Sequence, residues 1–193
     1  MARTSKKTQL LESALGIIEA DGVQALTYES LATATGLSKS GLIYHFPSRH
    51  ELLVDCHRFC AARWEAELET LAGGRSADEL TAVQRRRALV LSLGKTDPLI
   101  ELLMSLHARQ HPDFAAPWDV VDARWMHPGA GSCSDPGAEA DGRQDLGELL
   151  LTLLTAGLWV HDHLSSHRLD DAARRQVVDL ILSRIDSGEP IRL

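Results

Sequence analysis

The stretch that decides the fold covers residues 26–53 and reads LTYESLATATGLSKSGLIYHFPSRHELL. Its local signals predict two short helices joined by a tight turn. Thr27 precedes the first helical pattern, where its hydroxyl can accept a hydrogen bond from a free amide of the first turn. Gly36 suits the turn, because glycine adopts positive φ without steric cost. Ser38 is placed to cap a second helix, which Pro47 ends.

The second helix, residues 39–45, is predicted to bury one face and to expose the other. Leu42 and Phe46 lie four residues apart and would face inward. The outward positions are polar, small or aromatic: Lys39, Ser40, Gly41 and Tyr44. A helix of two turns is not stable alone in water, so its exposed face needs a function. A helix-turn-helix places such a helix in the DNA major groove, where small residues permit close approach and polar side chains donate to phosphates or bases.

This stretch resembles the DNA-binding domain of the TetR family of transcriptional repressors, and the resemblance covers about the first quarter of the chain. The residues that carry it occur in family order and spacing: Gly22, Thr27, Leu31, Ala32, Gly36, Leu37, Ser38, Tyr44, His45, Phe46, Ser48, Arg49, Leu52 and Leu53. Residues 41–46 read GLIYHF, similar to a subgroup that reads GLLYHF. The commonest family tyrosine would stand at Ile43. Arg49 and His50 occupy positions where the family most often has a lysine and an acidic residue.

The resemblance implies an all-α protein with two domains. A three-helix helix-turn-helix domain is expected at residues 1–48, and a larger helical ligand-binding and dimerisation domain at residues 49–193. The predicted DNA-binding residues are Thr27, Tyr28, Ser38, Lys39, Ser40, Gly41, Tyr44, His45 and Arg49. Of these, Lys39, Tyr44, Thr27 and Arg49 are expected to hold phosphates, while Ser40, Gly41 and His45 approach bases.

Helical periodicity continues on both sides of this stretch. A helix is predicted over residues 8–21, and the basic residues 3–7 before it are either a solvated terminus or an arm that neutralises phosphates. Further helices are predicted over residues 49–72, 77–93, 98–110, 117–125, 146–160 and 172–185. Residues 127–142 read HPGAGSCSDPGAEADG, and their composition predicts a mobile loop.

The last two predicted helices are rich in leucine, isoleucine and valine. In TetR-like proteins such helices pair with their counterparts in a four-helix interface, so the resemblance implies a homodimer. Dimerisation also has an independent reason. One short recognition helix touches few bases, and a twofold pair that reads a palindrome doubles the contacts.

Charge and cysteine usage fit a protein that touches DNA at one end. The net charge is −7, with +1 on the first 50 residues and −8 on the rest. Cys56 and Cys60 lie one helical turn apart, where a disulfide would strain the helix, so reduced thiols are expected. The chain opens without a signal-peptide pattern, and its longest apolar run, residues 149–160, is too short to span a bilayer. We therefore predict a cytoplasmic protein with no membrane partner.

Other charged and histidine clusters carry weaker predictions. Residues 85–87 are three consecutive arginines, for which a solvated face or a set of acidic partners is favoured over a second DNA patch. The pairs His107 with His111 and His163 with His167 have helical i, i+4 spacing, but neither has a third ligand at suitable spacing. No metal site or cofactor is predicted. Motifs of hydrolases, zinc peptidases and P-loop enzymes are missing from the sequence, so an enzyme is not expected.

Large apolar side chains with a few polar tips are predicted to line a small-molecule pocket in the helical body. These are Trp64, Met104, His107, Trp118, Trp125 and Trp159. The predicted function is a ligand-responsive transcriptional regulator, a repressor that binds a palindromic operator in double-stranded DNA as a homodimer and is released by a small organic effector. The alternative is a helical small-molecule-binding protein whose helix-turn-helix is non-functional. Steep loss of DNA affinity with salt would distinguish the two.

Overall fold

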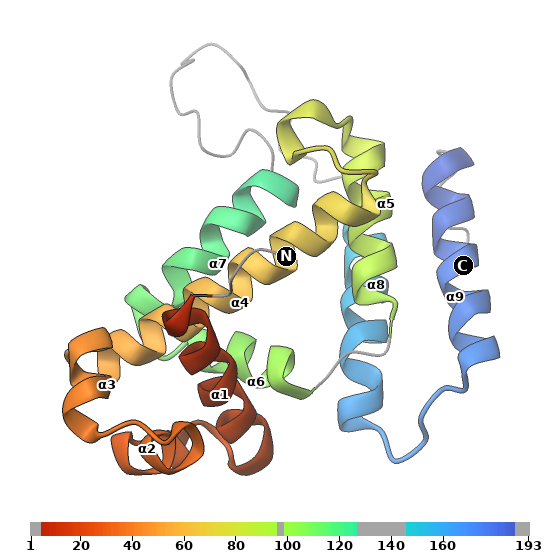
Figure 1. Cartoon of the computed structure of the whole chain (residues 1–193). Coiled ribbons are helices and arrows are strands. Elements are labelled where there is room, and N and C mark those ends of the chain that lie inside the picture. The colour runs from red at the N-terminus through yellow and green to blue at the C-terminus, as the bar shows by residue number, and fades with distance from the viewer. Residues whose placement is uncertain (1–4, 96–98, 127–145, 188–193) are drawn as a thin grey trace. The chain divides into compact units, whose positions relative to one another are not determined.

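The computed structural model describes residues 5–95, 99–126 and 146–187, and the regular elements in those ranges are all helices (Figure 1). The all-α prediction is therefore confirmed. Two compact units share the chain: residues 1–64 with 98–119, and residues 65–97 with 120–193. The predicted domain boundary between residues 48 and 49 separates the residues expected to bind DNA from those expected to bind a ligand. It stays a prediction.

The first unit begins with the helix-turn-helix domain. The elements of the whole first unit are α1 (Lys6–Asp21), the 3-10 turn η1 (Val23–Ala25), α2 (Tyr28–Thr35), α3 (Lys39–His45), residues 49–64 of α4 (Arg49–Leu71), α6 (Leu99–Ala108) and residues 112–119 of α7 (Pro112–Trp125). The first helix starts two residues before its predicted position because the Ser5 hydroxyl accepts from the Thr8 amide at 3.1 Å. Lys6 and Lys7 of the predicted basic arm are therefore helical, and Arg3 lies outside the described residues.

One core holds these helices together. Side chains with no exposed surface come from α1, α2, α3 and α4, and include Ile18, Leu31, Leu42 and Leu52. Phe46, directly after α3, is also fully buried. Leu42 and Phe46 thus face inward as predicted. Since burial of one such side chain contributes about 1.5–3 kcal/mol, this shared core fixes α3 against α2 far better than its own seven residues could.

The predicted caps and turn of the helix-turn-helix are confirmed. The Thr27 hydroxyl accepts from the Ser30 amide at 3.0 Å, and the Ser30 hydroxyl accepts from the Thr27 amide in return. Gly36 ends α2 with φ of 70°, a left-handed conformation that favours glycine. Ser38 caps α3 by accepting from the Gly41 amide at 3.2 Å.

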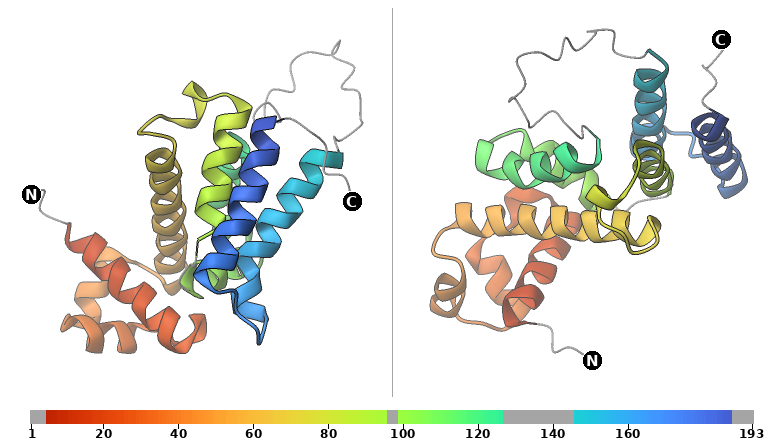
Figure 2. Two further views of the ribbon diagram at one scale, coloured as in Figure 1. Left: turned by 90° about the vertical axis from the view of Figure 1, so that its right-hand side faces the viewer. Right: turned by 90° about the horizontal axis from the view of Figure 1, so that it is seen from above.

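The second unit contains residues 65–71 of α4, the 3-10 turn η2 (Ala77–Glu79), α5 (Ala82–Leu93), residues 120–125 of α7, α8 (Leu146–Leu164) and α9 (Asp171–Ser187). Figure 2 shows α5 packed beside both α8 and α9. Val90, Ile181 and Ile185 form the centre of their interface. Gly94, at the end of α5, permits this packing because a Cβ there would lie 2.5 Å from the Val178 side chain.

The prediction of one uninterrupted helix over residues 77–93 is wrong. The Ser76–Glu79 capping box exists, but it starts only η2, and Thr81 then caps α5 as a second N-cap. The Arg85 guanidinium donates from Nη1 to the carbonyls of Ala77 at 2.9 Å and Leu80 at 2.6 Å. These bonds satisfy carbonyls that a continuous helix would have paired internally.

The start predicted for the helix at residue 117 is also wrong, because α7 begins at Pro112. Proline lacks the amide hydrogen that the first helical position leaves unpaired, and the next amide, of Asp113, donates to His111 Nδ1 at 3.1 Å. Pro117 lies within the helix. The predicted start at Pro98 and the predicted loop over residues 127–142 fall outside the described residues.

The other predicted helices agree with the structure to within a few residues at their ends. Cys56 and Cys60 are free, buried thiols, and burial raises the pKa of Cys60 to about 12. Among the helices that the structure describes, none combines the length and the apolar character needed to cross a bilayer.

Candidate nucleic-acid interface

The outer face of α3 presents polar and aromatic groups to solvent. Tyr44 is 85 % exposed, and its ring contacts that of His45 edge-on, with centroids 5.4 Å apart. Lys39 and Ser40 are exposed, while Gly41 and His45 are half-buried. Tyr44 contributes no buried surface to the core of the unit. Its ring is therefore accessible from solvent on the outer face of α3.

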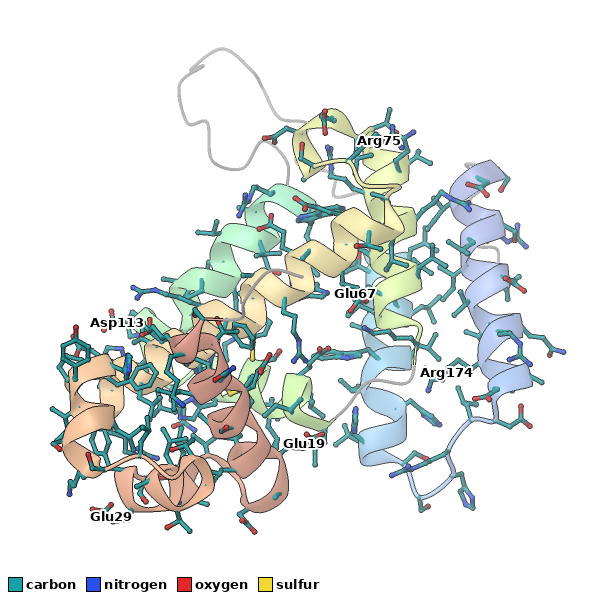
Figure 3. All side chains as sticks on the ribbon, in the orientation of Figure 1. Glu19, Glu29, Glu67, Arg75, Asp113 and Arg174 are labelled. Atoms are coloured by element: carbon teal, nitrogen blue, oxygen red, sulfur yellow. The ribbon has the colours of Figure 1, made fainter. Side chains whose placement is uncertain are left out.

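Lys39 is paired with a carboxylate of the neighbouring helix. Its Nζ lies 2.7 Å from Oε1 of Glu29, which Figure 3 labels on α2. This hydrogen bond raises the pKa of Lys39 and lowers that of Glu29. Both side chains are exposed, and an exposed ion pair adds little stability. Lys39 can therefore exchange Glu29 for a phosphate at small energetic cost.

Two of the predicted DNA contacts hold the domain together in this structure. The Tyr28 hydroxyl donates to the carbonyl of Phe46, which ties α2 to the end of α3. Arg49 donates from Nε to the Leu26 carbonyl at 2.7 Å and from Nη2 to the Val23 carbonyl at 2.9 Å. Both side chains are half-buried, and burial is the main cause that raises the pKa of Tyr28.

The predicted DNA-binding set therefore divides by what each side chain already does. Thr27 and Ser38 cap their helices, and Tyr28 and Arg49 donate hydrogen bonds to backbone carbonyls of neighbouring segments of the domain. Lys39, Ser40, Gly41, Tyr44 and His45 lie along α3 itself. All nine DNA contacts stay predictions. The sequence did not reveal these structural roles of Tyr28 and Arg49, because the backbone carbonyls that accept their hydrogen bonds lie 18 to 26 residues away along the chain.

The six residues predicted to line a ligand pocket fall into both units. Trp64, Met104, His107 and Trp118 belong to the first unit, and Trp125 and Trp159 to the second. Met104 is fully buried in the core. The rings of Trp64 and Trp118 lie 6.2 Å apart between centroids. Their role in ligand binding stays a prediction.

His57, which sequence analysis did not single out, connects two of these residues. Trp118 Nε1 donates to His57 Nδ1 at 3.0 Å, and His57 Nε2 lies 3.0 Å from His107 Nδ1. Since the indole only donates, His57 Nδ1 must be unprotonated, and its Nε2–H then donates to His107. The side chain of His57 is fully buried, and burial together with His107 lowers its pKa to about 4. This is a polar chain of neutral groups inside the first unit.

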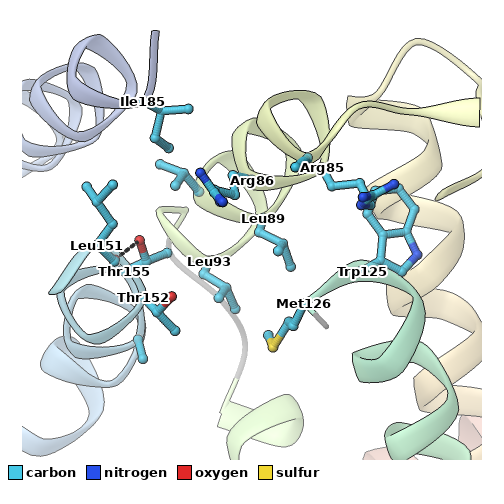
Figure 4. Close-up of a pocket in the computed structure, with 13 residues that line it drawn as sticks. Arg85, Arg86, Leu89, Leu93, Trp125, Met126, Leu151, Thr152, Thr155 and Ile185 are labelled. Atoms are coloured by element: carbon cyan, nitrogen blue, oxygen red, sulfur yellow. Dashed lines mark hydrogen bonds between the residues drawn. The ribbon is translucent and has the colours of Figure 1, made fainter. Parts of the chain in front are cut away.

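The second unit contains a pocket of about 430 Å³ (Figure 4). Apolar side chains of α5, α7 and α8 supply most of its wall, among them Leu89, Leu93, Trp125 and Leu151. Arg85 lines it too, and its Nε is buried without a hydrogen-bond partner. Trp125 is the one residue of the predicted ligand set among the lining residues described by the structure.

The arginine triplet at residues 85–87 has three different surroundings. Arg85 binds backbone carbonyls, Arg86 lines the pocket with it, and Arg87 pairs with Asp186 of α9. The pair with Asp186 agrees with the favoured prediction of acidic partners.

Comparison with known proteins finds a family match for the N-terminal helices. Residues 10–56 match the family model of the bacterial regulatory proteins of the tetR family. Over 111 residues, the chain is 30 % identical to the nucleoid occlusion factor SlmA of Enterobacter sp. (strain 638). That similarity covers 55 % of this chain and 54 % of the relative, so the chain spans about half the length of the relative that it matches.

Solved structures share the fold over nearly the whole chain. A transcriptional regulator from Rhodococcus sp. Rha1 superposes with a TM-score of 0.64 and 16 % identity, covering 98 % of this chain and 100 % of that one. A protein from Saccharomonospora viridis, solved in complex with choline, gives a TM-score of 0.61 and 20 % identity, with coverage of 98 % and 100 %. The family model thus matches the N-terminal helices of this chain, and the solved structures, at 16 % and 20 % identity, show that the chain shares their all-helical fold.

Proposed function

We propose that the protein is a repressor that binds a palindromic operator as a homodimer and is released by a small organic effector. The observation that carries the DNA-binding part is α3 itself, where Lys39 and Tyr44 are exposed, Tyr44 by 85 %, while Leu42 is fully buried. Selection from random double-stranded DNA tests this directly. Failure to enrich any sequence would contradict it and favour a helical ligand-binding protein with a non-functional helix-turn-helix.

Gly41→Ala is expected to strengthen the fold and to weaken DNA binding at least tenfold. A Cβ at Gly41 would lie 3.4 Å from Ser38 Oγ, an ordinary contact, so alanine fits the free protein. Alanine also favours a helix over glycine by about 0.5–1 kcal/mol. If α3 lies against base edges, however, the added methyl group meets DNA. Thermal melting and fluorescence anisotropy with the selected operator measure the two effects.

Gly16→Ala is the matched control for this change. Gly16 is an exposed glycine within α1, and a Cβ there would meet nothing within 4 Å. This variant should melt higher with unchanged operator affinity. If Gly41→Ala binds the operator as tightly as Gly16→Ala does, α3 does not approach the bases.

The homodimer part of the proposal is supported by apolar side chains left in solvent on the last two helices. Leu153 is 59 % exposed on α8 and Leu180 is 58 % exposed on α9. Leu154 and Val177 add exposed apolar surface on the same helices. A twofold interface buries the same patch on both subunits, so helices from each chain would cover one another there.

Leu180→Arg is expected to convert the dimer into monomers at micromolar concentration, because it places a charge at the centre of an apolar interface. Operator affinity should fall with it, since a single recognition helix makes half of the contacts. Light scattering after gel filtration measures the mass. Leu106→Arg, at a 63 % exposed leucine of α6, is the control and should leave the dimer intact. A dimeric Leu180→Arg variant would place the interface elsewhere.

The effector part of the proposal is supported by the pocket of the second unit. Its volume of about 430 Å³ falls in the range of sites for small organic molecules. The wall is largely apolar, and an acceptor on the ligand could satisfy the buried Arg85 Nε. The similar structure solved with choline gives a precedent for a small organic ligand in this fold. Linkage requires that an effector lowers DNA affinity by the same factor by which DNA lowers effector affinity.

Leu89→Trp is expected to fill the pocket and to abolish the response to effectors. A screen of small organic compounds for raised melting temperature and weakened operator binding would first identify ligands of the wild-type chain. Val83→Trp, on the same helix at an exposed position that does not line the pocket, is the matched control. Compounds that act equally on both variants would show that the effector binds outside this pocket.

A further inference from the structure

Two histidines and one aspartate meet on the surface of the first unit, outside the face of α3. His50 lies in the first turn of α4, His111 directly precedes α7, and Asp113, labelled in Figure 3, lies in the first turn of α7. His50 Nε2 is 2.8 Å from Asp113 Oδ2, and His111 Nδ1 is 3.5 Å from the same oxygen. One ligand atom from each residue lies within 4.8 Å of the other two.

These separations are close to those of a tetrahedral site. Donor atoms at about 2.0–2.2 Å from Zn²⁺ lie roughly 3.3–3.6 Å from one another at tetrahedral angles. The three groups therefore need to shift by about an ångström or less to surround an ion. Their side chains are 42 %, 46 % and 56 % exposed, which leaves them free to adjust and accessible to an ion from solvent.

The donor set selects a class of metal ion. Two imidazole nitrogens and one carboxylate oxygen suit zinc and its neighbours in the first transition series, whereas calcium and magnesium prefer oxygen ligands throughout. Phe114 borders the site on one side, with its ring centroid 4.9 Å from that of His50 and 5.3 Å from that of His111. The exposed side leaves a fourth position for water.

We propose that His50, His111 and Asp113 bind one divalent transition-metal ion, with Zn²⁺ as the best-fitting probe. The ion would link the start of α4 to the start of α7. Because only Pro47 and Ser48 separate Phe46, the C-cap of α3, from α4, the same link would restrain the helix that follows the recognition helix. Coordination through His111 Nδ1 would replace the hydrogen bond that this atom accepts from the Asp113 amide.

The structure also separates His107 and His111, the two histidines that share helical i, i+4 spacing. His107, four residues before His111, is buried and bonded to His57. The partners of His111 are instead Asp113 and His50, which is 61 residues earlier in the chain. Only the packing of α7 against α4 within this unit brings them together.

The test is a calorimetric titration of the full, untagged chain with Zn²⁺ at neutral pH, with Co²⁺ as a visible-absorption probe of the ligand field. The wild type should bind one ion per chain, and His50→Ala and Asp113→Asn should each weaken binding at least tenfold. His167→Ala removes an exposed histidine outside the cluster and should change nothing. Zn²⁺ should also raise the melting temperature of the wild type and of His167→Ala only.

Two results would overturn the proposal. One is a wild-type chain that takes up no stoichiometric ion. The other is an ion whose affinity is the same in His50→Ala and Asp113→Asn as in the wild type, because that ion would be bound by other residues. Both side chains are exposed, so neither substitution removes buried surface, and a circular dichroism melt of each variant without metal checks that the fold is retained.

Discussion

Lys39→Ala combined with Tyr44→Ala is expected to lower operator affinity about a thousandfold while leaving the fold intact. Each dimer would lose four contacts with DNA, two per subunit. A loss of about fivefold or slightly more in affinity for each contact gives about a thousandfold in total. The melting temperature should stay close to that of the wild type, because Tyr44 is 85 % exposed and Lys39 pairs only with exposed Glu29 in this structure. Anisotropy titrations at several salt concentrations measure affinity and its salt dependence together.

The salt dependence identifies which contact is lost. If Lys39 neutralises a phosphate, its removal from both subunits should flatten the slope of log affinity against log salt by about 2. Glu29→Gln is a control with the opposite sign. It releases Lys39 and removes a carboxylate beside the DNA, so affinity should rise. A double variant that binds the operator like the wild type would show that α3 is not the recognition helix.

Acidification from pH 6.5 to pH 4 is expected to destabilise the first unit by about 3 kcal/mol through His57. The pKa of His57 is about 4 in the folded chain, against about 6.5 in the unfolded chain. Between these values the unfolded chain binds the extra proton, so stability falls as pH falls across this window and levels off below pH 4. Burial also lowers the pKa of His107, which adds an effect of the same sign.

His57→Phe isolates this contribution. The phenyl ring can keep the stacked contacts with His107 and Phe114, whose centroids lie 5.3 Å and 5.0 Å from that of His57, but it cannot take up a proton. Urea unfolding followed by tryptophan fluorescence at pH 4 to 7 compares the two chains. The variant should lose about 3 kcal/mol less stability than the wild type over this range. Parallel losses in both would show that the pKa of His57 is the same in the folded and the unfolded chain, which would contradict its neutral, buried state.

Sequence patterns were sufficient wherever the cause of a structure lies within about four residues. Thr27, Gly36 and Ser38 act on amides or dihedral angles of their own turn, so their roles in the helix-turn-helix could be read directly. The same rule explains the error over residues 77–93. Ser76 and Thr81 both carry cap signals, and their relative strength depends on Arg85, whose bonds to the Ala77 and Leu80 carbonyls form only after the chain has turned.

Side chains of the same type received different roles from their tertiary surroundings. Arg49 was predicted from its charge to hold a phosphate, and in the folded chain it braces two backbone carbonyls. His107 and His111 share helical spacing, but one is buried against His57 and the other meets His50 and Asp113 at the surface. Apart from Asp113, which follows His111 by two residues, these partners lie 23 or more residues away, so composition and spacing carry no information about them.

The sequence by itself therefore determined the helical class, the helix-turn-helix and the residues that its short helix exposes, since these follow from periodicity, caps and turn residues. Only the tertiary structure decided where a pocket lies, which histidines are buried and neutral, and that His50, His111 and Asp113 share one surface. The physical reason is the distance along the chain over which each interaction acts. Helix formation depends on neighbours within one turn, whereas burial, pKa and ligand geometry depend on helices that the chain brings together from distant positions.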